Sequence, residues 1–264
     1  MHRRILSADA DFQLALALLD NRKQRHRQRR FAVQSVAAID AALAHGWALD
    51  SVWTPAGRPL SAWARSVVER APLHVELAMP LFAQLSGKDE PGELVALVAL
   101  PADDLGRIAE TAAPLLVVCD RPSSPGNLGS IVRSADAFGA DAVLVTGHAA
   151  DPYDPQAVRA SIGAVFAVPV LQAGPPTELV AQLRTRWPGL RIAGTSARAD
   201  TPYRDVDLTG PVALAFGNEA SGLSAAWREA CDTLLAIPIH GVASSLNLAA
   251  AAAVVLAEAG RQRT

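Results

Sequence analysis

Apolar residues along the chain form two kinds of segment, short dense runs typical of strands and longer stretches with helical spacing. In the C-terminal part the runs are dense enough to predict strands buried on both faces, as in a parallel sheet covered by helices. The predicted strands are residues 115–119, 142–145, 167–170, 191–194, 212–216 and 233–237. The predicted helices are residues 129–138, 155–162, 177–186, 223–230 and 246–260. This alternation predicts an α/β domain.

The first hundred residues repeat the alternation on a smaller scale. Helices are predicted at residues 11–20, 35–45, 61–69 and 80–85, and strands at 31–34, 49–54, 73–77 and 94–100. A segment with Pro, Asp and Gly begins at Pro101 and favours a linker. We therefore expect a small α/β domain over 1–100, a linker over 101–113 and a larger domain over 114–264.

Composition narrows the class of protein. Half of the 264 residues are hydrophobic and 19% are charged, which permits a sizeable core and excludes global disorder. The formal net charge is −2: residues 1–100 carry 12 Lys and Arg against 10 Asp and Glu, and residues 101–264 carry 12 against 16. A nucleic acid would therefore be held by a local patch of charge rather than by the net charge.

The sequence lacks the features expected of a membrane protein, a secreted protein or a metal-binding protein. No apolar run is long enough to predict a membrane span, and no secretory signal is visible at the N-terminus, so we expect a cytoplasmic protein. Cys119 and Cys231 have no Cys or His companions at metal-binding spacing, so neither a metal site nor a disulfide scaffold is expected.

Polar residues and glycines follow three of the predicted strands in a fixed order. They read Asn-Leu-Gly-Ser-Ile-Val-Arg over 127–133, Phe-Gly-Asn-Glu-Ala-Ser-Gly over 216–222, and Ile-Pro-Ile-His-Gly-Val-Ala-Ser-Ser-Leu-Asn over 237–247. Ligands of open parallel sheets bind at the carboxyl ends of strands, and glycines permit tight turns there. Each motif alone is also compatible with a structural turn or a helix cap. The three together predict a ligand site.

In order, spacing and flanking strands, these motifs resemble the signature motifs of the SpoU/TrmH family of RNA ribose 2′-O-methyltransferases. The resemblance implies a SPOUT-type parallel sheet with a deep trefoil knot near the C-terminus. It also implies S-adenosylmethionine as the cofactor and a homodimer formed through the knotted domain. Two positions depart from the usual motifs: Ser124 stands where an acidic residue is frequent, and Ala220 where glycine is common.

The resemblance implies roles for single residues. Asn127 and Arg133 become the catalytic pair beside the ribose, and the supporting polar residues are Glu219, Ser245 and Asn247. The residues that would contact the cofactor are Thr195, Ser196, Phe216, Gly217, Asn218, Glu219, Ile237, Ile239, Ser245 and Leu246. Because a guanidinium is essentially always protonated, we expect Arg133 to stabilise the developing alkoxide rather than to act as the general base. No metal is required.

A basic segment precedes the strand predicted at 31–34. It resembles the start of the L30e-like substrate-binding domain of many of these enzymes, although Val-Gln-Ser stands at 33–35 in place of the usual Val-Glu-Gly. Such a domain would clamp structured RNA through phosphate contacts and shape. The candidate RNA contacts are Arg22, Lys23, Arg25, Arg27, Arg29 and Arg30. The alternative is a solvated charged turn.

The resemblance thus implies S-adenosylmethionine-dependent methylation of a ribose 2′-hydroxyl in structured RNA. The L30e-like domain favours 23S rRNA over tRNA, although a tRNA 2′-O-methyltransferase stays open. A non-catalytic RNA-binding or ribosome-assembly factor that kept the fold is a further alternative. An ordinary nucleotide-binding enzyme would need a glycine-rich loop after its first strand and an acidic residue about 20 residues on, which the segment beginning at Pro125 does not supply.

Overall fold

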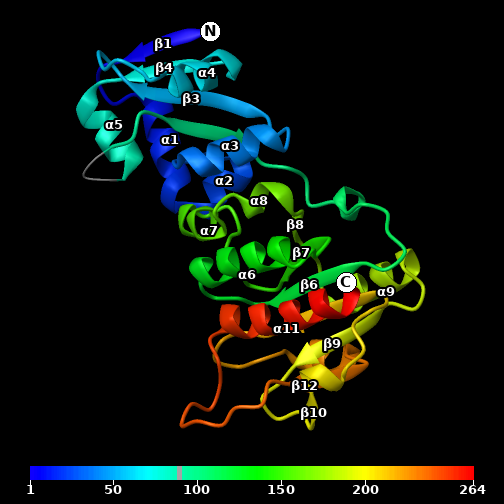
Figure 1. Ribbon diagram of the computed structural model, residues 1–264. Coiled ribbons are helices and arrows are strands. Elements are labelled where there is room, and N and C mark those ends of the chain that lie inside the picture. Colours follow the sequence, from blue (N-terminus) through cyan, green and yellow to red (C-terminus); the bar gives the residue numbers. More distant parts are fainter. Residues whose placement is uncertain (88–90) are drawn as a thin grey trace. The chain divides into compact units, whose positions relative to one another are not determined.

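The computed structural model describes residues 1–87 and 91–264, which form two compact units (Figure 1). Unit 1 comprises Met1–Pro101 and Tyr153–Phe166, and unit 2 comprises Ala102–Pro152 and Ala167–Thr264. Both units combine helices with a sheet, so the predicted α/β class is confirmed. A short segment from the second half of the chain therefore belongs to the N-terminal unit.

Unit 2 is built on a seven-stranded sheet, and the predicted parallel arrangement is confirmed. The strand order is β10-β12-β9-β11-β6-β7-β8, with every neighbouring pair parallel. The strands are β6 (Leu115–Asp120), β7 (Ala142–Thr146), β8 (Val170–Gln172), β9 (Arg191–Thr195), β10 (Thr201–Pro202), β11 (Val212–Phe216) and β12 (Thr233–Ala236). The central strands are buried on both faces, which explains their unbroken apolar runs.

Helices cover both faces of this sheet. The helices are α6 (Pro125–Ala137), α9 (Pro176–Arg186), α10 (Ala225–Ala230) and α11 (Leu248–Arg263), with short 3-10 turns η1 (Leu105–Arg107) and η2 (Tyr203–Asp205). α6 and α11 lie side by side (Figure 1). The core on the α9 and α10 side is centred on Trp227, whose buried indole N–H donates to Thr146 Oγ1 at 3.0 Å.

Unit 1 has a five-stranded mixed sheet in the order β1-β4-β3-β5-β2, in which β5 runs antiparallel to both its neighbours. The strands are β1 (His2–Ile5), β2 (Arg30–Val33), β3 (Leu49–Pro55), β4 (His74–Leu77) and β5 (Val95–Ala99). The helices are α1 (Ala10–Asp20), α2 (Arg22–Gln28), α3 (Val36–Ala44), α4 (Ala62–Arg70), α5 (Met79–Ser86), α7 (Pro155–Ser161) and α8 (Ala164–Ala167), of which only the last residue belongs to unit 2. Side chains of Asp9, Ser35 and Ser61 cap the N-termini of α1, α3 and α4.

An aromatic cluster joins the segment 153–166 to the N-terminal residues of unit 1. The Phe31 ring lies 4.8 Å from that of Tyr153, and the Trp47 ring lies edge-on to Phe166 at 5.0 Å between centroids. The Trp47 indole N–H also donates to the Phe166 carbonyl at 2.9 Å. These contacts place part of the unit 1 core on residues far away in the sequence.

Some sequence predictions were wrong. The strand predicted at 167–170 is shifted to β8 at Val170–Gln172, because Ala167 ends α8 and Pro169 has no N–H for a ladder. β1 was missed because three of its four residues are exposed, so it lacks an apolar pattern. The basic segment is not a turn but the helix α2, capped by the Asn21 side chain, which accepts from Gln24 N.

Arg25 corrects one predicted RNA contact. Its side chain is buried, with 1% of the residue exposed. Its guanidinium donates to the Leu18 carbonyl at 2.9 Å, the Leu19 carbonyl at 3.2 Å and the Asp154 carboxylate at 3.2 Å. These bonds close the end of α1 and tie α2 to the N-cap residue of α7. Arg25 is therefore a structural residue and is not available at the surface of unit 1.

We predict that Arg25→Ala lowers the free energy of unfolding by about 3 kcal/mol, because it leaves the partly buried Asp154 carboxylate and two carbonyls without their buried donor. Arg27→Ala on the same helix is the control: Arg27 is exposed, so its change stays within about 0.5 kcal/mol. Urea unfolding followed by circular dichroism measures both. Equal stability of the two variants would contradict this role of Arg25.

Candidate active site

Four neighbouring strands end at one edge of the unit 2 sheet. Because β12, β9, β11 and β6 are adjacent and parallel, their carboxyl ends lie together. Asp120, Thr195 and Phe216 are the last residues of three of them. The loops that follow these strands carry most of the polar residues singled out in the sequence.

The carboxylate of Glu219 is the centre of a hydrogen-bond network at this edge. Its Oε2 accepts from the Ser123 hydroxyl at 2.8 Å and from the Ser123 backbone N–H at 3.1 Å. Its Oε1 accepts from Asn127 Nδ2 at 3.0 Å and from the Ser124 N–H at 3.4 Å. One carboxylate thus joins the loop after β11 to the loop between β6 and α6.

The network continues from the first motif to the third. Asn127 Oδ1 accepts from Asn247 Nδ2 at 3.1 Å. Asn247 in turn caps α11, since its Oδ1 accepts from the N–H groups of Ala249 and Ala250 at 2.9 and 3.3 Å. The Asn127 amide is therefore held at both ends, by Glu219 and by Asn247. The three motifs form one site.

The environment keeps Glu219 ionised. Burial by itself raises the pKa of this carboxyl, but the hydrogen bonds from the Asn127 side chain, from its own backbone and from Ser123 outweigh it and lower the pKa to about 2. At neutral pH the group is an acceptor only. It is suited to hold Asn127 in place and not to donate a proton.

Arg133 and Ser245 lie outside this network. Arg133 is exposed on α6, and its guanidinium forms no hydrogen bond or ion pair within residues 1–87 and 91–264. Ser245 is exposed in the loop before α11, and its hydroxyl has no partner in the same described ranges. The structure therefore brings together Asn127, Glu219 and Asn247, while the other two predicted catalytic residues present free polar groups to solvent.

The loop after β11 is folded back on itself. Asn218 and Gly222 exchange backbone hydrogen bonds of 3.1 and 2.9 Å, and Asn218 Oδ1 accepts from the N–H groups of Ala220 and Ser221. Gly217 is required sterically, because a Cβ at this position would lie 2.1 Å from both Gly222 C and Leu223 N. Because the two backbone segments approach so closely, the position of Asn218, directly before Glu219, is fixed.

Asp120 and Arg121 hold the other side of the same loop and were missed in the sequence. The buried Asp120 carboxylate accepts from Ser224 N at 2.7 Å and from the guanidinium of Arg121 at 3.0 Å. That guanidinium also donates to the Gly222 carbonyl at 2.9 Å, and Arg121 has φ of 54°, a conformation unfavourable for a non-glycine residue. An Asp-Arg-Pro sequence directly after a buried strand was the available signal.

The predicted cofactor residues occupy loops of two kinds. Thr195 is anchored, since its hydroxyl donates to the Ala215 carbonyl at 3.1 Å, and Phe216 is fully buried. Residues 237–246 form no backbone–backbone hydrogen bond with any described residue. The same loop exposes Ile239 and Leu246. The unused backbone groups of this loop can form hydrogen bonds with the edge of a nucleoside base, and its apolar side chains can pack against the face of the base.

The basic residues of unit 1 differ in their availability. Lys23, Arg27 and Arg29 are exposed, whereas Arg22 and Arg30 are partly buried. Arg29 donates to the carbonyls of Leu100 and Pro101, and Arg30 pairs with Asp50. Within the described residues no group of three or more His, Cys, Asp or Glu side chains could hold a metal ion, and no helix there is long and apolar enough to cross a membrane.

Comparison with known proteins decides the family. The model of the SpoU rRNA Methylase family matches residues 114–257, more than half of the chain, and the model of the SpoU L30e-like domain matches residues 9–96. The chain belongs to the SpoU rRNA methylase family. The resemblance inferred from the three motifs is confirmed.

Individual SpoU proteins match nearly the whole chain. A 23S rRNA (uridine(2479)-2′-O)-methyltransferase from Streptomyces viridochromogenes is 44% identical over 266 residues, covering 99% of this chain and 93% of the relative. The crystal structure of the SpoU methyltransferase AviRb from the same organism with AdoMet has a TM-score of 0.92 at 44% identity, covering 97% of this chain and 98% of that one. An AdoMet-bound rRNA methyltransferase from Sinorhizobium meliloti has a TM-score of 0.87 at 29% identity, covering 98% of both chains.

We predict that Gly217→Ala destabilises the protein by more than about 2 kcal/mol, because the added methyl group overlaps backbone atoms that cannot move independently. Gly210→Ala is the matched control, since a Cβ there has no atom within 4 Å, and its effect stays within about 0.5 kcal/mol. Thermal unfolding compares the two. Similar midpoints for both variants would show that the loop adapts.

The low pKa of Glu219 predicts a specific pH dependence. A carboxyl whose pKa falls from about 4.3 in the unfolded chain to about 2 in the folded one stabilises the fold above pH 4.3, and this contribution disappears as the pH falls toward 2. Urea midpoints of the wild type and Glu219→Gln should therefore differ at pH 7, and the difference should shrink as the pH falls from about 4.3 toward 2. A constant difference across this range would contradict the network.

Proposed function

We propose that this protein transfers a methyl group from S-adenosylmethionine to a ribose 2′-hydroxyl of structured RNA, with 23S rRNA as the preferred substrate. The observation that carries the proposal is the network of Glu219, Asn127 and Asn247 at the strand-end edge of a SpoU-family sheet. The relative of S. viridochromogenes that matches almost the whole chain is named a 23S rRNA uridine 2′-O-methyltransferase, which supports the same substrate class.

The loops at the sheet edge fit the cofactor. Residues 237–246 offer backbone donors and acceptors that no described residue uses, beside exposed apolar side chains such as Ile239 and Leu246. The proposed contacts are Thr195, Ser196, Phe216, Gly217, Asn218, Glu219, Ile237, Ile239, Ser245 and Leu246. When bound, S-adenosylmethionine supplies an electrophilic methyl group on a sulfonium, so the protein needs chiefly to bring the 2′-oxygen into line.

In this mechanism Asn127 positions the ribose. Glu219 accepts one of its two Nδ2 hydrogens, and Asn247 donates to its Oδ1. The second Nδ2 hydrogen is left for the ribose, and these two bonds fix the direction in which it points. The guanidinium of Arg133 is unpaired within the described residues and permanently charged, so it can stabilise the negative charge that develops on the 2′-oxygen and contact the adjacent phosphate. The proton leaves to solvent or to an RNA oxygen, not to Arg133. Ser245 supplies a further free hydroxyl near the start of α11.

Unit 1 is proposed to bind RNA outside the reacting nucleotide. The match of residues 9–96 to the SpoU L30e-like domain supports an RNA-binding role, and the exposed side chains of Lys23, Arg27 and Arg29 supply positive charge. We propose that the chain is divided by function into an RNA-binding part over 1–100, a linker over 101–113 and a methyltransferase part over 114–264.

The resemblance to the family suggests three further properties. We propose that the C-terminal segment is threaded into a trefoil knot and that the chain forms a homodimer through this knotted domain. Half-exposed Val254 and Ala257 on α11 provide an apolar strip that suits such an interface. Because rRNA is modified where ribosomes are made, a cytoplasmic location is proposed as well.

Arg133→Ala separates an enzyme from a binding factor. We predict a fall in methyl transfer on the order of 100-fold or more, because charge stabilisation at the reacting oxygen is lost, while binding of RNA and S-adenosylmethionine stays within a few-fold of the wild type. Incubation with labelled S-adenosylmethionine and unmodified 23S rRNA or tRNA, followed by mapping of ribose methylation, measures this. A wild type that binds the cofactor but labels neither RNA would overturn the proposed function.

A further inference from the structure

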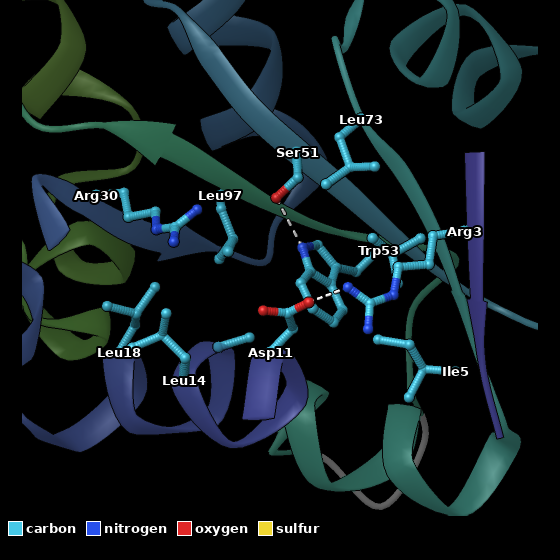
Figure 2. Close-up of a pocket in the computed structure, with 12 residues that line it drawn as sticks. Arg3, Ile5, Asp11, Leu14, Leu18, Arg30, Ser51, Trp53, Leu73 and Leu97 are labelled. Carbon is cyan, nitrogen blue, oxygen red and sulfur yellow. Dashed lines mark hydrogen bonds and ion pairs between the residues drawn. The ribbon is translucent and has the colours of Figure 1, made fainter. Parts of the chain in front are cut away.

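Unit 1 contains a cavity of about 110 Å³ that is separate from the strand-end site (Figure 2). It lies between α1 and one face of the sheet, because its lining comes from α1 and from all five strands or their flanks. Most of the lining is apolar, and the apolar residues are Ile5, Leu14, Ala15, Leu18, Trp53, Leu73, Val75 and Leu97. The polar residues are Arg3, Asp11, Arg30 and Ser51.

Arg30 has donors that the fold does not use. Its Nη1 donates to Asp50 at 2.7 Å, whereas its Nε is buried and has no hydrogen-bond partner, and its Nη2 forms no bond within the described ranges. A buried donor without an acceptor costs about 1–3 kcal/mol, so such a group in a native protein calls for an explanation. Nη2 is thus a guanidinium donor that remains for an acceptor from outside the fold.

An exposed ion pair flanks the cavity. Arg3 pairs with Asp11 (Figure 2). Its other terminal nitrogen lies 2.7 Å from the Asp9 carboxylate. About half of each side chain of the Arg3–Asp11 pair is exposed, at 48% and 52%. Exposed pairs of this kind contribute only about 0–1 kcal/mol. This side of the cavity can therefore open at little cost, and Arg3 can turn toward an anionic group.

We propose that this cavity binds one unstacked pyrimidine base of the RNA, an inference that rests on the proposed function. An apolar cavity of about 150 Å³ accommodates a benzene ring. A cavity of about 110 Å³ whose Arg3–Asp11 side can open therefore takes at most a single six-membered ring and is too small for the fused rings of a purine. The carbonyl that both pyrimidines carry beside the glycosidic nitrogen supplies an acceptor for Nη2 of Arg30. Proteins read RNA mainly through such unstacked bases.

The direct test compares hexamers of uridylate and adenylate bound to the full chain, by fluorescence anisotropy at one salt concentration. The wild type is expected to bind the uridylate hexamer at least tenfold more tightly. Leu14→Trp fills the cavity from α1 and should abolish this preference, as should Arg30→Leu, which removes the donors and keeps the bulk. Gln13→Trp is the matched control, since Gln13 is exposed on the same helix and does not line the cavity; its preference should stay as in the wild type.

Equal affinity of the wild type for both hexamers would overturn the proposal, as would a preference that survives in both Leu14→Trp and Arg30→Leu. If Leu14→Trp disturbs the fold, as judged by its urea midpoint, Arg30→Leu decides alone. Measuring methylation of 23S rRNA with the same preparations distinguishes a failure of the cavity proposal from a failure of the proposed function. If the wild type methylates RNA and both cavity variants keep its KM for RNA, the cavity proposal fails and the enzyme stands; if the wild type methylates no RNA, the proposed function itself fails.

Discussion

The carboxylate of Glu219 is the interaction on which the arrangement of the site depends. It accepts two hydrogen bonds from Ser123, one from Ser124 and one from Asn127, residues more than 90 positions earlier in the chain. A carboxylate is an acceptor only, so it can gather several donors and orient each of them. Through the Asn127 amide this order extends to Asn247 and the first turn of α11. Without the carboxylate, these donors would lose their common acceptor and would form hydrogen bonds with water instead.

The loop that carries Glu219 is held from two sides, which gives the carboxylate a fixed position. Gly217 lets the loop close on Gly222, and Asp120 fixes its far end through Ser224. Arg121, whose backbone conformation costs energy, donates both to the Asp120 carboxylate and to the Gly222 carbonyl and so connects these two parts of the loop. A functional group needs such support from rigid elements, since small displacements of a reacting group reduce rates strongly.

The sequence predicted the parts of the molecule that follow from local patterns. The dense apolar runs identified the parallel sheet, and the rule that ligands bind at strand ends pointed to the loop that carries Glu219. The roles of Glu219 and Asn127 came from the resemblance of the motifs to the SpoU family. It did not predict the partners that fold back from distant segments, such as Ser123 and Asp120, because a serine or an aspartate in a loop has no periodic signal. The burial of Arg25 was missed for a related reason: charge alone suggested a surface role, whereas three acceptors from α1 and α7 enclose it.

The aromatic cluster of Phe31, Trp47, Tyr153 and Phe166 has a consequence for the chain as a whole. Unit 1 takes its last helical segment from between two strands of unit 2, so the polypeptide passes from one unit to the other three times. A fragment cut at Pro101 would lack Tyr153 and Phe166 and would expose the rings that they cover. Neither unit can therefore be exchanged with that of a relative by a single crossover.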